Sequence, residues 1–188
     1  MKILFAARLE AVKNPIMFVK AGIQLPDHEF IVAGDGSLRK QCEMLARGRK
    51  NIVFLGWVDT ENMKRLMDET DVFCQLDSVE NIWSSSLVAA MKNKKAAICT
   101  STGYTSKYLK DNYHVLLISQ KEPSELVRAI ERLSNDTELR RMLGVNAQTL
   151  VNENLSTEKI VKEIRGWITA TVQNKKEQQD KLKNEPRK

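Results

Sequence analysis

Short apolar runs alternate with amphipathic segments along most of the chain, and this alternation limits the folds that the sequence can adopt. The apolar runs lie at residues 2–7, 30–33, 52–55, 72–74, 96–99 and 115–118. Each is short and apolar on both faces, which is typical of strands in a parallel sheet that is covered on both sides. We therefore predict a single Rossmann-like α/β domain with a six-stranded, mostly parallel sheet, helices on both faces and a long C-terminal helix.

Capping residues and prolines indicate where the helices begin. Asn14 followed by Pro15 is a good helix start, and Pro123 opens another helix. A final long helix is expected from Ser156, with apolar residues at a helical period. From Asn174 the apolar partners end, so we predict a domain over residues 1–173 and a basic frayed or disordered tail over 174–188.

The formal charge of +6 and the pI of about 9.2 are moderately basic. No zinc-finger spacing or RNA-binding signature accompanies this charge, so we expect no nucleic-acid partner. A basic cleft for a small phosphorylated ligand would use the same charge. For the basic tail we expect a solvated end, with a weak contact to anionic membrane as the alternative.

Cysteine and histidine usage indicates neither disulfides nor a metal site. Cys42, Cys74 and Cys99 are odd in number and lie mostly in apolar runs, as reduced core thiols of a cytoplasmic protein do. His28 and His114 are far apart and form no metal-ligand pattern. No run approaches the roughly 20 apolar residues that span a membrane. We expect a soluble, cytoplasmic chain, at most associated with the inner face of a membrane.

The stretch from Asp71 to Cys99 has the order strand, polar loop, helix, strand. In an open α/β sheet, ligands collect where strand carboxyl ends meet helix amino ends, and Glu80 is the candidate carboxylate at that position. A second loop at residues 34–37 begins like a dinucleotide fingerprint, but Arg39 stands at the third glycine position. That loop is therefore either a tight strand-to-helix turn or a ligand loop.

Several loops, in order, carry a resemblance to a known family. The segments are ARLEAVK, AGDGSL, NIVFLGWV, DVF followed by SVENIW, LVAAMKNKKAAICTSTGY and DNYHVLLI. Together they resemble the C-terminal, donor-binding domain of GT-B glycosyltransferases. The similar branch is the retaining one, which includes mannosyltransferases and bacterial glycogen and sucrose synthases. The resemblance covers roughly residues 1–170.

The resemblance implies roles for individual residues. Arg8 and Lys13 would grip the donor diphosphate and stabilise its departure, with no metal or other cofactor needed. Glu80 would lie beside the donor sugar, and the backbone amides of residues 84–86 would meet the diphosphate at a helix N-terminus. The donor-binding positions implied in this way are Gly34, Asp35, Gly36, Gly56, Trp57, Val58, Ser84, Ser85, Ser86 and Val88.

The chain departs from the family pattern at three places. Val88 stands where relatives carry a second glutamate that holds the ribose hydroxyls, and an isopropyl group cannot make that clamp. Residues 93–95 (Asn-Lys-Lys) replace the usual Gly-x-Pro turn, and Ala7 replaces a glycine. These departures put the affinity for the donor or the choice of donor in question.

Two functions follow from these observations. The first is the donor half of a retaining glycosyltransferase, which transfers a sugar from a UDP-, GDP- or ADP-sugar to an acceptor held by an N-terminal domain or a partner subunit. We expect this chain alone to bind the nucleotide sugar without efficient transfer. The second is a non-catalytic interaction or regulatory module of the same fold. A response-regulator-like or NAD-binding domain is disfavoured, because the acidic cluster and the third glycine are missing.

Overall fold

The computed structural model describes residues 1–79, 84–119 and 122–154, together with residues 161, 165, 166, 168, 169 and 171. Intrachain contacts divide the protein into Met1–Leu150 and Val151–Lys188, and the sheet lies within the first unit. The strands are β1 (Lys2–Ala6), β2 (Glu29–Ala33), β3 (Ile52–Gly56), β4 (Val72–Gln75), β5 (Ala96–Thr100) and β6 (Leu116–Ile118). The helices are α1 (Pro15–Gln24), α2 (Arg39–Leu45), α3 (Thr60–Glu69), α4 (Ser85–Lys92), α5 (Gly103–Tyr108), α6 (Pro123–Asn135) and α7 (Thr137–Asn154), with a 3-10 turn η1 (Ala11–Lys13).

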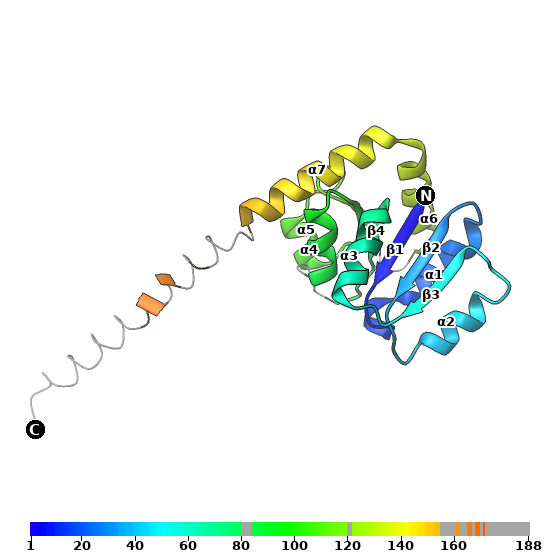
Figure 1. The fold of residues 1–188 in the computed structure, drawn as a ribbon. Coiled ribbons are helices and arrows are strands. Elements are labelled where there is room, and N and C mark those ends of the chain that lie inside the picture. Colours follow the sequence, from blue (N-terminus) through cyan, green and yellow to red (C-terminus); the bar gives the residue numbers. More distant parts are fainter. Residues whose placement is uncertain are drawn as a thin grey trace, which may run out of the picture. The chain divides into compact units, whose positions relative to one another are not determined.

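The strands form one parallel sheet in the order β3-β2-β1-β4-β5-β6 (Figure 1). The chain builds outward from β1 to β3 and then returns to place β4 against the other side of β1. The connections that leave β1 and β4 therefore diverge at the middle of the sheet, which is where open α/β sheets bind ligands. The predicted six-stranded sheet is confirmed, and all of its strand pairs are parallel.

Both faces of the sheet are buried under helices, as predicted (Figure 1). On one face, Ile3 and Phe5 join a core formed with α1 and α6. The Phe18 ring of α1 lies 5.4 Å from Phe5 and 5.1 Å from Phe30 between ring centroids. Leu4 alternates to the opposite face, where it is also fully buried. Such two-sided burial explains why the strands read as continuous apolar runs.

Three local details differ from the sequence prediction. Asn14 occupies the N-cap of α1, but its side chain makes no capping hydrogen bond because its backbone is left-handed, with φ 54°. Helix α5 begins at Gly103, earlier than expected, because Thr102 and Thr105 form a capping box. The last strand begins at Leu116 rather than Val115. The helix start predicted at Ser156 and the predicted tail, residues 174–188, lie outside the described residues.

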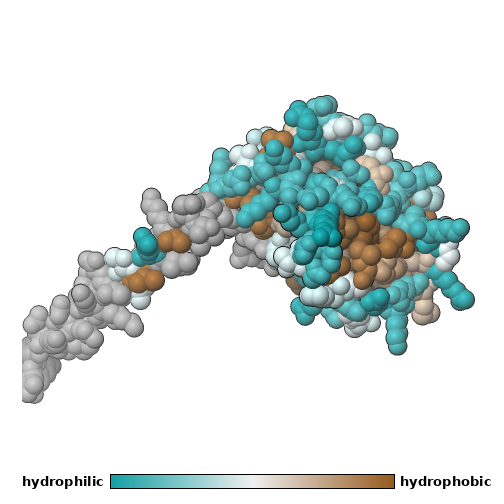
Figure 2. Space-filling view, viewed as in Figure 1, coloured by the Kyte–Doolittle hydropathy of each residue, from teal (hydrophilic) through white to brown (hydrophobic). Residues whose placement is uncertain are grey.

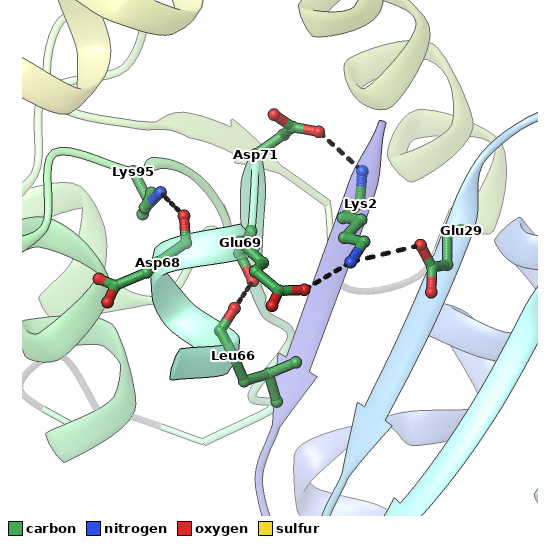
Figure 3. Close-up of polar contacts among 8 residues, drawn as sticks. Lys2, Glu29, Leu66, Asp68, Glu69, Asp71 and Lys95 are labelled. Atoms are coloured by element: carbon green, nitrogen blue, oxygen red, sulfur yellow. Dashed lines mark hydrogen bonds and ion pairs between the residues drawn. The ribbon is translucent and has the colours of Figure 1, made fainter. Parts of the chain in front are cut away.

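Ion pairs connect the amino ends of the strands, at the edge of the sheet opposite the candidate ligand loops (Figure 3). The Lys2 ammonium lies 2.6 Å from Glu69 and 3.9 Å from Glu29. The backbone N–H of Lys2 also donates to the Asp71 carboxylate at 2.8 Å. The hydrogen bond to Glu69 raises the pKa of Lys2 and lowers that of Glu69. These charges link β1 to its neighbours on both sides.

The cysteines Cys42, Cys74 and Cys99 are free and buried, as predicted. Burial raises the pKa of the Cys42 thiol to about 11, and it raises the pKa values of the other two as well. All three thiols therefore stay protonated at neutral pH. No helix in the described part of the chain combines the length and the apolar character needed to cross a membrane.

Candidate functional site

A cavity of about 160 Å³ opens at the carboxyl ends of β1 and β4, where the strand order reverses. It is bordered by the loop after β1, by the end of β4 and by the first turn of α4. The polar residues around it are Arg8, Lys13, Gln75, Asp77, Ser84, Ser85 and Ser86. Five of the residues predicted from the sequence (Arg8, Lys13, Ser84, Ser85 and Ser86) are thus brought together in one place.

Arg8 and Lys13 both border this cavity, but they differ in their ion pairing among the described residues. The Arg8 side chain is exposed, and within the described residues it makes no hydrogen bond or ion pair. The Lys13 ammonium lies 2.9 Å from the Asp77 carboxylate, with the two side chains 17% and 5% exposed. Asp77 was not among the site residues predicted from the sequence. Asp77 follows the buried β4 run, in a loop at the point where the strand order reverses. A polar residue at that position is a candidate ligand contact, and this is the sequence signal that would have identified Asp77.

The first turn of α4 presents backbone donors to the cavity. Ser84 is the N-cap, and its hydroxyl accepts a hydrogen bond from the Leu87 N–H at 3.2 Å while donating to the Gln75 side chain. In the parts of the chain that are described, the N–H groups of Ser85 and Ser86 have no acceptor. Unpaired N–H groups and the positive end of the helix dipole together favour an anion at this position.

Hydrogen bonds from the β2 turn fix the loop that carries Arg8. The Ala7 N–H donates to the Ala33 carbonyl at 3.1 Å. The Glu10 carboxylate accepts from the Ser37 N–H at 3.0 Å and from its hydroxyl at 2.6 Å. These hydrogen bonds lower the pKa of Glu10, and the bond from the Ser37 hydroxyl contributes most. The loop after β1 is therefore held in place at both ends of its Arg8 segment.

The Gly34–Gly36 segment supports the site without lining the cavity. Gly34 has φ +146°, and a Cβ atom added there would lie 1.9 Å from the Ala7 carbonyl oxygen. Asp35 accepts from the Gly36 N–H at 2.8 Å and from Arg39 at 2.9 Å, and these contacts lower its pKa. In the structure this segment is a tight turn against the loop after β1. Its predicted role in binding the donor stays a prediction.

The predicted segment from Gly56 to Val58 lies apart from the cavity. Trp57 is 79% exposed and lines a separate groove of about 400 Å³ with Leu55 of β3 and Leu66 of α3. Figure 2 shows a hydrophobic area on the molecule in the region of β2 and β3. Gly56 itself touches the other loops through its carbonyl, which accepts from the Gly34 N–H at 2.7 Å.

Glu80 and Val88 are the remaining two predicted site residues. Glu80 lies outside the described residues. Val88 is half-buried on α4, and it is not among the described residues that border the cavity. The structure therefore brings together the residues predicted for the diphosphate, whereas the contacts predicted for the sugar and the ribose stay predictions.

Comparisons with known proteins agree with this architecture. The family model described as Glycosyl transferases group 1 matches residues 1–150. A Campylobacter jejuni relative, "GalNAc-alpha-(1->4)-GalNAc-alpha-(1->3)-diNAcBac-PP-undecaprenol alpha-1,4-N-acetyl-D-galactosaminyltransferase", is 33% identical over 153 residues. The match covers 78% of this chain and 42% of the relative. The chain thus spans less than half the length of the curated relatives it matches.

Solved structures share the fold. Anabaena HepE in complex with UDP and glucose superposes with a TM-score of 0.80 at 18% identity, over 90% of this chain and 48% of that one. The C-terminal domain of LpcC, a glycosyl transferase group 1 family protein from Francisella tularensis, gives a TM-score of 0.73 at 21% identity, over 83% and 86%. This chain therefore has the same fold as the C-terminal domain of LpcC, whose structure was solved as a separate domain.

Proposed function

Because the chain belongs to the group 1 glycosyl transferases and has the fold of their C-terminal domain, we propose that its cavity binds the diphosphate of a nucleotide-sugar donor. The observation that carries this proposal is the meeting of Arg8, Lys13 and the first turn of α4 around one cavity at the switch point of the sheet.

The chemistry of these groups suits a diphosphate. Two cations and the N–H groups of Ser85 and Ser86 offer charge-assisted hydrogen bonds to phosphate oxygens. The same groups would stabilise the negative charge that develops on a nucleoside diphosphate as it leaves the sugar. The donor complexes of HepE with UDP and UDP-glucose support a nucleotide-sugar ligand in this fold.

The acceptor would be bound elsewhere. Since the curated relatives are more than twice as long as the matched segment, we infer that a second domain or a partner subunit holds the acceptor. Transfer with retention of configuration would then take place between the two parts, with Glu80 beside the donor sugar. The chain by itself would bind the donor without efficient transfer.

Calorimetry on the chain tests the donor site. We expect UDP, GDP or ADP to bind with a Kd of about 10 μM to 1 mM, and the matching nucleoside to bind far more weakly. Ser85→Pro removes one N–H donor at the first position of α4, where proline is well tolerated in a helix. The loss of that charge-assisted hydrogen bond should weaken diphosphate binding about tenfold.

Thr60→Pro is the matched control, because Thr60 is the first residue of α3, which begins outside the cavity. This variant should bind the nucleotide like the unchanged protein. No binding of any of the three nucleoside diphosphates at millimolar concentration would refute the proposed function. That result would favour the non-catalytic interaction module instead.

A further inference from the structure

The cavity contains a carboxylate at the place where an anion is expected to bind. The Asp77 side chain is only 5% exposed, and one of its oxygens lies 2.9 Å from the Lys13 ammonium. Both residues border the cavity. An anionic ligand that reaches Lys13 must therefore approach an acidic side chain at the same time.

The backbone of Asp77 is held firmly in this position. Its carbonyl accepts a hydrogen bond of 2.5 Å from the Thr100 hydroxyl of the neighbouring strand β5. The next residue, Ser78, donates its N–H to the Val12 carbonyl at 2.9 Å. The strand end that carries Asp77 is thus tied both to the sheet and to the loop that carries Lys13.

The pair changes the charge of the site. Among the described residues that border the cavity, the charged side chains are Arg8, Lys13 and Asp77. Their sum is one positive charge, whereas the two cations predicted to act on the diphosphate would give two. An ammonium group has three N–H donors. Lys13 can therefore keep its bond to Asp77 and still offer a donor to a ligand.

We propose that Asp77 is a positioning residue that holds the Lys13 ammonium at the cavity and lowers the affinity of the site for diphosphate. This inference rests on the proposed function, because it concerns the ligand of the same cavity. Asp77 holds the flexible Lys13 side chain in one rotamer. Ligand binding then no longer carries the entropic cost of ordering the Lys13 side chain. Its negative charge opposes the charge of the ligand, so nucleoside diphosphates bind less tightly than the two cations alone would allow.

Asp77→Asn separates these two effects, since the amide oxygen still accepts a hydrogen bond from Lys13 while the charge is lost. We expect UDP and inorganic pyrophosphate to bind about tenfold more tightly to this variant. That figure follows from two phosphate charges about 6 Å from the carboxylate at the dielectric constant of bulk water, about 80, and it is therefore a lower bound. The gain should be smaller for UMP, absent for uridine, and reduced by added salt.

Asp27→Asn is the matched control. It removes the same charge from an exposed carboxylate in the loop before β2, outside the cavity. We expect no change in the affinity for UDP. A purely structural role of Asp77 would alter the binding of uridine and UDP alike, so the dependence on ligand charge is the decisive readout.

A double-mutant cycle tests the pair without any ligand. Lys13→Met removes the ammonium group beside the buried Asp77 carboxylate, which should raise the unfolding equilibrium constant about a hundredfold. Adding Asp77→Asn to Lys13→Met should restore most of that loss, because the buried charge disappears. Additive effects of the two substitutions in urea unfolding would overturn the proposed pairing.

The outcomes separate this inference from the proposed function. UDP binding that Asp77→Asn leaves unchanged or weakens would overturn the inference and leave the donor site intact. No UDP binding by either protein would overturn both, whatever the double-mutant cycle gives. Tighter binding that rises with ligand charge, together with coupling in the cycle, supports the inference.

Discussion

Gly34→Ala is expected to lower the free energy of unfolding by about 3 kcal/mol or more. The backbone of Gly34 has φ +146°, which side-chain-bearing residues rarely adopt. The new Cβ atom would also lie 1.9 Å from the Ala7 carbonyl oxygen, so the β2 turn and the loop after β1 would have to separate. Urea denaturation measures the loss, and weaker diphosphate binding should accompany it because that loop carries Arg8.

Gly48→Ala is the control for this substitution. Gly48 also has a positive φ, +79°, but an added Cβ atom would meet nothing within 4 Å. We expect a cost of about 1 kcal/mol, from the backbone conformation alone. Equal losses for the two variants would contradict the view that close contact between the loops makes glycine necessary at residue 34.

Arg8→Ala should weaken the binding of UDP by about 10- to 100-fold and leave the binding of uridine unchanged. The exposed guanidinium makes no ion pair within the described part of the protein, so its donors are free for a diphosphate. A charge-assisted hydrogen bond of this kind contributes about 1.5–3 kcal/mol. Calorimetry with UDP, UMP and uridine measures the difference, and the protein should unfold at nearly the same urea concentration.

The matched control for Arg8→Ala is Arg49→Ala, which removes an exposed arginine in the turn before β3, outside the cavity. It changes the net charge equally and should leave the affinity for UDP within about twofold at moderate salt. If both arginines mattered equally, UDP would be responding to the overall charge of the protein rather than to a site.

The order and type of the elements could be predicted because burial on both faces makes each strand a short apolar run. Boundaries were less accurate where local hydrogen bonds decide them. The capping box of Thr102 and Thr105 extends α5 toward its amino end, and the left-handed backbone of Asn14 removes the expected side-chain cap. Both effects depend on local hydrogen bonds and backbone conformation, which the spacing of apolar residues does not reveal.

For the candidate site, the sequence predicted which loops meet, but it did not predict all of their contacts. Arg8, Lys13 and the serines of α4 come together because parallel strands end at one edge of the sheet. The pairing of Lys13 with Asp77 depends on the path of two loops that are 64 residues apart, which no local pattern encodes. Trp57 is exposed on a separate groove because β3, which precedes it, is the outermost strand on one side of the sheet.

The most direct test of the donor site is a titration of the isotope-labelled chain with UDP, followed by the NMR chemical shifts of the backbone amides. If the cavity binds the diphosphate, UDP should cause the largest chemical-shift changes at the N–H groups of Ser85 and Ser86 and in the loop around Arg8. Uridine, which has no phosphate, should cause none of these changes. Saturation with UDP that leaves the amides of Ser85 and Ser86 unmoved would contradict the assignment of this cavity as the diphosphate site.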